Sequence, residues 1–260
     1  MWNLVAGAGN AFPQSLEGTM ILRAKRTVII GGTSGIGFAV AEAALREHAD
    51  VVVVSSKKEN VDAAMKRLAD GVKGFAVDVR NEEDVSGFFE RLGSFDHLVF
   101  TAGDWGAMAG GPLAEIDLTN AAQAFTVRFW GALSCIKHAH KHISAGGSIT
   151  LTDGMIAHRP RKGAAVSSAM AGAIEHLTRG LALELAPVRV NAVCPGYVRT
   201  EVWNSIPEDK REERFKRMTE RLPLPRIGEP AEIAEAYLYL MRGGYTTGQV
   251  LHVEGGMGLA

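Results

Sequence analysis

The sequence predicts an α/β fold, in which one doubly wound parallel sheet of seven strands is covered by helices on both faces. Two observations predict this fold. Short runs of apolar and β-branched residues alternate with helical segments along the chain, which is the pattern of parallel strands joined by crossover helices. A glycine-rich turn at residues 31–37 joins the first apolar run to the first helical segment, as in loops that bind phosphate groups.

The expected strands are short, rich in Val, Ile, Leu or Phe, and bounded by turn residues. They are residues 28–30, 51–54, 74–79, 96–101, 147–152, 188–193 and 249–253. Helical periodicity falls between them, at residues 39–45, 59–70, 117–142, 164–185, 207–221 and 230–242. A further helix is expected after Asn81, because Asn suits an N-cap and the next three residues, Glu82, Glu83 and Asp84, are acids that a helix N-terminus favours.

The composition is that of a globular protein with a sizeable core. The chain has 260 residues, 47% of them hydrophobic and 22% charged, and a net charge of −1, which indicates no nucleic-acid-binding surface. No apolar run reaches the length of a membrane span, so we expect no membrane partner. Cys135 and Cys194 match no disulfide or metal spacing, and we therefore expect a reducing, cytoplasmic location.

The chain divides into two unequal parts. Residues 1–19 show no strand or helix pattern, and we expect them to form a flexible N-terminal extension. No repeat, low-complexity run or linker interrupts residues 20–260. We therefore expect these residues to form a single domain that carries both the cofactor site and the substrate site.

The glycines of residues 31–37 have separate physical roles. Gly31 lets the chain turn tightly, Gly35 lets the backbone approach a pyrophosphate, and Gly37 lets the helix pack closely on the strand. The free N–H groups and positive dipole end of the following helix then attract the phosphates. An ordinary structural turn is the alternative. The residues predicted to contact the phosphates are Gly31, Thr33, Ser34, Gly35, Ile36 and Gly37.

From about residue 24 to its end, the chain resembles the short-chain dehydrogenase/reductase family, whose fold is of the Rossmann type. The resemblance rests on several motifs in order. These are the glycine loop, Asp78-Val79, Thr101-Ala102-Gly103, Leu181-Ala182-Leu183-Glu184-Leu185-Ala186, Arg189-Val190-Asn191, Pro195-Gly196-Tyr197-Val198-Arg199-Thr200, Thr247-Gly248-Gln249 and Glu254-Gly255-Gly256. Phe100 and Thr101 stand where the family has two asparagines. The resemblance implies that a dinucleotide contacts Asp78, Val79, Thr101, Ala102, Gly103, Pro195, Gly196, Val198 and Thr200.

The end of the second strand bears on the choice of cofactor. An acid there would bond the ribose 2′-hydroxyl of NAD, but this chain has Ser55, Ser56 and Lys57. Hydroxyl groups beside a cation suit a 2′-phosphate, so NADP(H) is the predicted cofactor. In the alternative interpretation, Lys57 and Lys58 are a solvated entry to the next helix.

The resemblance also exposes a missing catalytic set. The family uses an Asn, a Ser, a Tyr and a Lys, of which the Tyr donates a proton to the carbonyl oxygen and the Lys lowers the pKa of the Tyr. The alignment puts Arg128 at the Asn position, Gly154 at the Ser position, Ser167 at the Tyr position and Ala171 at the Lys position. The resemblance therefore does not carry the usual reaction over to this chain.

The loss of the acid restricts the substrates. Hydride addition to a neutral ketone makes an alkoxide that needs a proton, and a positioned acid contributes about 10²- to 10⁴-fold to such a step. Ser167 is shorter than Tyr and has no Lys one turn further on to acidify it. An iminium ion already carries positive charge, and hydride converts it directly into a neutral amine. The chain resembles reductases of fungal indole alkaloid pathways that lack the Tyr and Lys, some of which pair iminium reduction with a Diels–Alder cyclisation in the same pocket.

We therefore expect an NADP(H)-dependent reductase that acts on a bulky, pre-activated electrophile such as a cyclic iminium ion. A non-redox cyclase or isomerase and a catalytically dead nucleotide-binding protein are the alternatives. Arg128 and Asp153 are the candidate catalytic residues, since a cation and an anion there would orient a polar substrate; alternatively, they pair with each other or with helix ends. The predicted substrate pocket comprises Trp105, Met155, His158, Ser167, Tyr197 and Trp203.

Two further features bear on partners. His138 and His142 share a helix face but have no third ligand, so we expect no metal site. In the family that the chain resembles, the two long helices and the last strand form the interfaces of homodimers and homotetramers. The apolar helix at residues 164–186 is consistent with such self-association.

Overall fold

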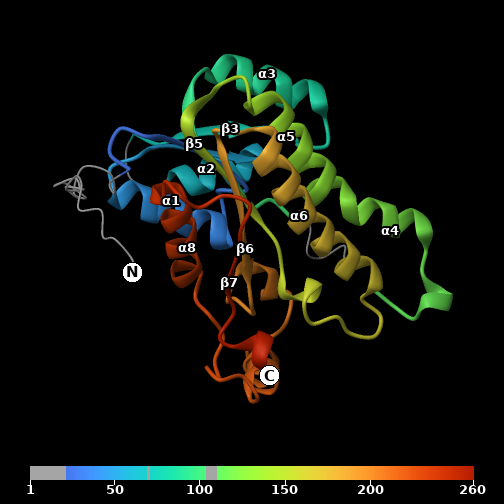
Figure 1. Cartoon of the computed structure of the whole chain (residues 1–260). Coiled ribbons are helices and arrows are strands. Elements are labelled where there is room, and N and C mark those ends of the chain that lie inside the picture. The colour runs from blue at the N-terminus through green and yellow to red at the C-terminus, as the bar shows by residue number, and fades with distance from the viewer. Residues whose placement is uncertain (1–21, 69–70, 104–109) are drawn as a thin grey trace, which may run out of the picture.

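The computed structural model describes residues 22–68, 71–103 and 110–260. It confirms the α/β class: one parallel sheet of seven strands has the order β3-β2-β1-β4-β5-β6-β7 (Figure 1). The expected extension at residues 1–19 lies outside the described residues. The strands are β1 Arg26–Ile30, β2 Asp50–Ser55, β3 Lys73–Ala76, β4 Phe95–Phe100, β5 Ile143–Thr152, β6 Arg189–Pro195 and β7 Val250–Val253.

Helices cover both faces of the sheet (Figure 1). Buried residues of α1 and α8 pack with Ile29, Val51 and Val53 on one face. Buried residues of α3, α5 and α6 pack with Val28, Leu98 and Ile149 on the other. The helices are α1 Gly35–Arg46, α2 Lys58–Met65, α3 Glu82–Leu92, α4 Leu118–Phe125, α5 Ala132–Ala139, α6 Ala165–Glu184, α7 Glu208–Thr219 and α8 Pro230–Arg242.

The strands contribute side chains to the hydrophobic cores on both faces of the sheet. Successive side chains of a strand point to opposite faces, and strands buried on both faces are therefore apolar throughout. The central residues of β2 and β4 are fully buried, as this requires. The cap predicted at Asn81 is also confirmed, because its side chain accepts hydrogen bonds from the N–H groups of Glu83 and Asp84.

Several element boundaries differ from the prediction. The fifth strand begins at Ile143, four residues before the expected start, and the first helix begins at Gly35 instead of residue 39. The helix expected at 117–142 is divided by a π-helical segment, Thr126–Gly131, and ends at Ala139. The helix expected at 59–70 ends at Met65, and residues 69–70 lie outside the described part of the chain. The third strand ends at Ala76, because the chain then turns at Asp78, whose carboxylate accepts a hydrogen bond from the backbone N–H of Arg80. In the described residues, no helix combines the length and apolar character needed to cross a membrane.

Candidate functional site

The carboxyl ends of the parallel strands meet at one edge of the sheet, and the predicted cofactor residues gather there. The strand order reverses between β1 and β4, which is the point where open α/β sheets bind ligands. After β1 come Gly31, Thr33, Ser34, Gly35, Ile36 and Gly37. At the end of β2 and before α2 lie Ser55, Ser56 and Lys57, and after β3 come Asp78 and Val79. After β4 come Thr101, Ala102 and Gly103, and at the end of β6 and after it lie Pro195, Gly196, Val198 and Thr200.

Two glycines are required where β1 and β4 separate. The N–H groups of Thr101 and Ala102 both donate to the Ile30 carbonyl oxygen, at 2.8 and 3.1 Å. Gly31 has a φ of +88°, and a Cβ there would lie 2.6 Å from the Ala102 nitrogen. A Cβ on Gly37 would overlap the Gly31 carbonyl oxygen and the Thr101 hydroxyl. Only glycine therefore permits this close passage of loop, helix and strand.

The N-terminus of α1 is built to receive an anion. Ser34 occupies the N-cap position without making a side-chain cap hydrogen bond. The backbone N–H of Gly35 donates instead to the carboxylate of Glu201, at 2.8 Å. A carboxylate from a distant loop thus stands where a phosphate group fits a glycine loop and a helix dipole. The glycine loop and the Gly35 N–H group therefore suit the pyrophosphate of a dinucleotide.

Two neighbouring lysines after β2 differ in their contacts. Lys58 forms an ion pair with Asp62 at 2.6 Å. In the described ranges, no carboxylate lies within ion-pair distance of Lys57, which is exposed beside Ser56. Asp78, which follows the neighbouring strand β3, accepts hydrogen bonds from the Arg80 guanidinium, and that contact lowers the pKa of Asp78.

The segment after β6 is held firmly against its neighbours. The Gly196 N–H donates to the Val253 carbonyl oxygen at 3.0 Å. Val198 is buried and pairs with Gly228 in an isolated bridge. Thr200 precedes a short helical turn that contains Glu201. This segment therefore links the cofactor edge to the loop that supplies the Glu201 carboxylate.

The face of α6 that points into the domain carries Ser167 and Ala171, the residues predicted to stand at the family's Tyr and Lys positions. Ser167 and Ala171, one turn apart, are both buried. The helix reads AVSSAMAGAIEHLTRGLALE and contains neither Tyr nor Lys. Arg128 lies in the π-helical segment and is 8% exposed. Burial raises the pKa of Tyr237, whose hydroxyl lies 2.6 Å from that of Thr152 at the end of β5, while the positive charge of Arg128 opposes the rise in pKa.

Asp153 is buried directly after β5, next to Gly154. Burial raises the pKa of Asp153 to about 8, and the nearby Glu175 carboxylate adds to the rise. Burial alone would raise the pKa of Glu175 as well, but Asp153, His158 and Arg179 bring it below its ordinary value. Asp153 therefore holds a proton at neutral pH, and Glu175 carries the charge. The expectation of an anionic Asp153 is revised, because two buried carboxylates do not both ionise.

Glu175 is a site residue that sequence reasoning missed. It is 6% exposed and lies two turns beyond Ser167 on α6. Its carboxylate lies 2.5 Å from the His158 ring and 3.4 Å from the Arg179 guanidinium. A single acid on the otherwise uncharged inner face of a helix is the signal that would have found it.

The residues predicted to line the substrate pocket lie in different environments. Met155 is buried and packs with Cys194 and Met257. Trp203 donates its indole N–H to the Val198 carbonyl oxygen and packs edge-on against Phe215 of α7. His158 turns toward Glu175, Ser167 is buried in α6, and Tyr197 is 37% exposed. Trp105 lies outside the described residues.

A cavity of about 480 Å³ lies beside the N-terminus of α1. Three predicted site residues, Gly35, Thr200 and Trp203, line it together with Glu201. Charged side chains from α1, α7 and the loops also line the cavity: Glu42, Arg67, Arg199, Arg211 and Glu229. The cavity is continuous with the position at which Glu201 meets the glycine loop.

Known proteins with similar sequences cover almost the whole chain. Residues 31–258 match the family model described as enoyl-(acyl carrier protein) reductase. The short-chain dehydrogenase/reductase ucsE of Acremonium sp is 35% identical over 254 residues, which are 90% of this chain and 96% of that protein. The short-chain dehydrogenase/reductase malC of Malbranchea aurantiaca is 33% identical over 254 residues, with 91% and 96% covered.

Solved structures agree with these relatives. The MalC reductase/Diels-Alderase from Malbranchea aurantiaca superposes with a TM-score of 0.86 at 32% identity, covering 93% of this chain and 99% of that one. A small-chain dehydrogenase in complex with NADPH superposes with a TM-score of 0.76 at 34% identity, covering 91% and 100%. Fold and sequence therefore point to the same group of proteins.

Proposed function

This chain belongs to the short-chain dehydrogenase/reductase family, and from that premise we propose that it is an NADP(H)-dependent reductase of a bulky, pre-activated electrophile such as a cyclic iminium ion. The observation that carries the proposal is the pairing of an anion-binding glycine loop with an α6 that has neither Tyr nor Lys. The chain thus keeps the means to bind a hydride donor and lacks the family's proton donor.

Three features support NADP(H) as the cofactor. Gly35 already holds a carboxylate where a phosphate would bind. Lys57 is exposed and has no ion-pair partner among the described residues, so its ammonium is available to a 2′-phosphate. A structural neighbour of the same family is a complex with NADPH. When bound, the reduced nicotinamide supplies hydride, while the chain's own residues hold and orient it.

The buried polar groups at the end of β5 support an altered pocket. We propose that Arg128 and Asp153 orient polar groups of the substrate. Asp153 is the hydrogen-bond donor in this arrangement, because burial and the Glu175 carboxylate raise its pKa to about 8. Arg128 is the cation, positioned by the π-helical turn that interrupts the long helix. π-helical turns are frequent at functional sites.

The pocket is also proposed to guide a cyclisation of the Diels–Alder type. Support comes from the neighbour described as a reductase/Diels-Alderase, which covers 93% of this chain. Within this chain, Tyr197 and Trp203 supply aromatic surface near the cofactor edge. Such surface suits a ring-containing substrate.

The test is NADPH oxidation with matched cyclic iminium ions and ketones. We expect turnover of the iminium ions and rates at least about 10²-fold lower for the ketones, because a ketone lacks the positioned acid. Comparable turnover of simple ketones would contradict the proposal. NADPH binding without turnover would indicate a catalytically dead protein, and ring formation without NADPH oxidation would indicate a non-redox cyclase.

Two substitutions test the proposed residues within this assay. Arg128→Ala and Asp153→Ala should each lower kcat for the iminium substrate by about 10²-fold, the usual cost of removing one preorganised polar group. Arg46→Ala, at the far end of α1 from the glycine loop, is the matched control and should leave the rate unchanged. Wild-type rates in the Arg128 and Asp153 variants would remove both residues from the mechanism.

A further inference from the structure

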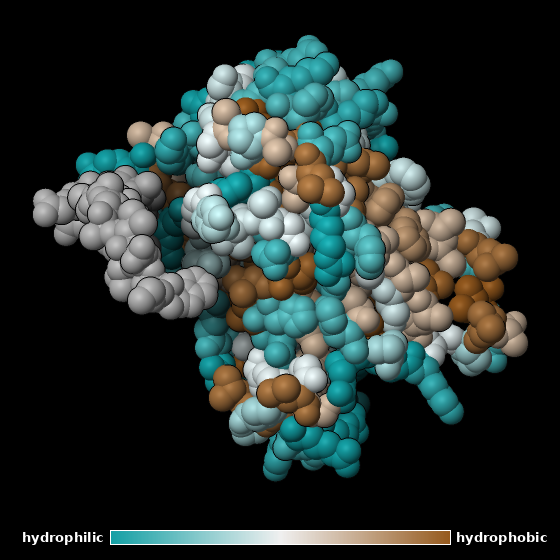
Figure 2. Space-filling model, viewed as in Figure 1, coloured by the Kyte–Doolittle hydropathy of each residue, from teal (hydrophilic) through white to brown (hydrophobic). Residues whose placement is uncertain are grey.

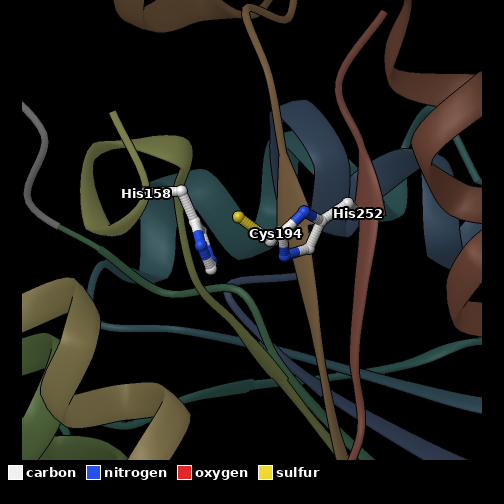
Figure 3. Close-up of side chains that lie close together, drawn as sticks. All are labelled: His158, Cys194 and His252. Atoms are coloured by element: carbon white, nitrogen blue, oxygen red, sulfur yellow. The ribbon is translucent and has the colours of Figure 1, made fainter. Parts of the chain in front are cut away.

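Three side chains from separate elements converge on the α6 side of the sheet. His158 comes from the turn after β5, Cys194 from β6 and His252 from β7, and Figure 3 shows them pointing toward one another. One ligand atom from each lies within 4.8 Å of the other two. The pairing of β6 with β7 places Cys194 beside His252, and the two imidazole centroids are 4.4 Å apart.

The burial of the three side chains suits entry of an ion from solvent. Cys194 is fully buried, at 0% exposure. His158 and His252 are both exposed and stand over it. The two exposed imidazoles are therefore the groups of this cluster that an ion from solvent meets first.

The set of donor atoms matches the preference of zinc. Two imidazoles and a thiolate are ligands that Zn²⁺ takes in tetrahedral sites, with Zn–N of about 2.0–2.1 Å and Zn–S of about 2.3 Å. Donor atoms in such a site are roughly 3.5 Å apart, by tetrahedral geometry from those bond lengths. The three atoms here lie within 4.8 Å of one another, so each pair has to close by no more than about 1.3 Å, which exposed histidine side chains achieve by small rotations.

A carboxylate pair completes the surroundings. Asp153, His158 and Glu175 also bring one ligand atom each within 4.8 Å of one another. The carboxyl groups of Asp153 and Glu175 are both buried. The Glu175 carboxylate lies 2.5 Å from Nε2 of His158, and a carboxylate on a ligand histidine orients the ring and strengthens its metal bond.

We propose that His158, Cys194 and His252 bind one divalent cation of the zinc class, with the Glu175 carboxylate orienting the His158 ring. Cys194 binds as the thiolate, so one S–metal bond forms and the thiol proton passes to solvent, with no change of oxidation state. The cation ties the turn after β5 to β6 and β7, and thereby fixes the loop that carries Met155 and His158. This site is separate from the proposed reductase chemistry and departs from the expectation of no metal.

The test uses the full chain without a histidine tag, freed of metal with a chelator and titrated with Co²⁺. We expect one Co²⁺ per chain, with the strong visible bands of a tetrahedral ion and a sulfur-to-cobalt charge-transfer band in the near ultraviolet. Added Zn²⁺ should displace the Co²⁺ and abolish both signals. Absence of stoichiometric Co²⁺ and Zn²⁺ binding by the folded wild-type chain would overturn the proposal.

Ligand variants separate this site from adventitious binding. Cys194→Ser should lose the charge-transfer band, and His252→Gln, an exposed substitution, should weaken Co²⁺ binding by more than about tenfold, since loss of even an outer partner costs 10- to 100-fold. Cys135→Ser and His138→Ala are the matched controls, because Cys135 is a buried thiol in α5 and His138 contacts Glu82 elsewhere. Retention of the band in folded Cys194→Ser, or equal weakening by the two control variants, would refute the site. If Cys194→Ser does not fold, the His252→Gln titration decides.

Discussion

At the scale of single residues, Lys57 and Lys58 have the same side chain but different contacts. Lys58 is held by Asp62 at 2.6 Å within α2. Lys57 precedes that helix and, within the described ranges, pairs with no carboxylate. Sequence alone left open whether these lysines serve a cofactor or merely a solvated helix entry. Because the ion pair with Asp62 occupies Lys58, we propose that only Lys57 serves the cofactor.

Lys57→Ala should weaken NADPH binding by about 5- to 30-fold, which corresponds to roughly 1–2 kcal/mol for a charge-assisted hydrogen bond. Binding of NADH should not change, because NADH has no 2′-phosphate. Titration of cofactor fluorescence measures both affinities. Lys58→Ala is the matched control and should affect neither cofactor. Equal losses for NADPH and NADH would mean that Lys57 does not contact the 2′-phosphate.

Asp153 couples the stability of the fold to pH. Its pKa rises from 3.8 to about 8, with burial as the main cause, so the folded chain holds a proton that the unfolded chain has released above about pH 4. The free energy of unfolding must therefore fall as the pH rises through this window, by about 1.4 kcal/mol per unit of pKa shift. The lowered pKa of Glu175 acts in the opposite sense, in the acid range below its ordinary 4.5.

Asp153→Asn should therefore flatten the fall in melting temperature between about pH 4 and pH 8, since each 1 kcal/mol corresponds to roughly 2–4 °C in a protein of this size. Differential scanning calorimetry across that range measures the effect. Asp62→Asn, on the exposed surface of α2, should keep the wild-type pH dependence. A wild-type slope in Asp153→Asn would show that Asp153 does not hold its proton at neutral pH.

At the scale of elements, the N-terminus of α1 and the turn after β6 share one contact. The Gly35 N–H donates to the Glu201 carboxylate at 2.8 Å, although the two residues belong to elements on opposite sides of the cofactor edge. A phosphate bound at this helix end needs the same N–H group. Glu201 therefore has to leave before the cofactor pyrophosphate is fully bound.

Glu201→Gln should tighten NADPH binding by about 2- to 5-fold, because an anion at a helix N-terminus is worth roughly 0.3–1 kcal/mol. Calorimetric titration gives the affinity directly. Glu208→Gln, in the first turn of α7, removes a charge seven residues further along the chain and should leave the affinity unchanged. Weaker binding in Glu201→Gln would show that the carboxylate assists the cofactor instead of competing with it.

The long helix before β5 is interrupted in a way that the sequence pattern does not predict. Its periodicity predicts one continuous helix, and the structure inserts a π-helical segment at Thr126–Gly131. A π turn adds one residue to a helical turn and so redirects the side chains within it. Arg128 lies in this segment and is nearly buried. Helical periodicity alone does not reveal such an insertion.

At the scale of the whole molecule, the described surface keeps large apolar side chains on the helices that flank the sheet. Leu118, Trp130 and Leu183 are 79%, 60% and 85% exposed on α4, the π-helical segment and α6. Figure 2 shows hydrophobic residues gathered over the side that α4 occupies in Figure 1. Exposed apolar patches of this kind mark interaction surfaces, and we propose that they join copies of this chain.

Light scattering after size-exclusion chromatography should therefore give a dimer or tetramer for the wild-type chain. Trp130→Glu should lower the measured mass, because a charge at the centre of an apolar interface is left without a partner. Tyr239→Glu is the control: Tyr239 is 51% exposed on α8, away from these helices. A monomeric wild-type chain, or an unchanged mass in Trp130→Glu, would contradict this interface.

Much of the fold and of the phosphate-binding edge was predictable from sequence, because both rest on local signals. Apolar runs predict strands that are buried on both faces. A glycine-rich loop before a helix predicts a phosphate-binding turn from only a few consecutive residues. The Asn81 cap is equally local. The polar cluster beyond β5 was not predictable, since Glu175, Cys194 and His252 lie in different elements and none matches a ligand spacing in the chain.

The sequence by itself determined the seven-stranded α/β class, the position of the glycine loop and the lack of Tyr and Lys on α6. Only the tertiary structure decided that Glu201 meets Gly35, that Asp153 lies against Glu175, and that His158, Cys194 and His252 converge. The physical reason is the range of each signal. Periodicity and turn chemistry act over a few residues, whereas the protonation and contacts of a side chain depend on which distant elements the parallel sheet brings beside it.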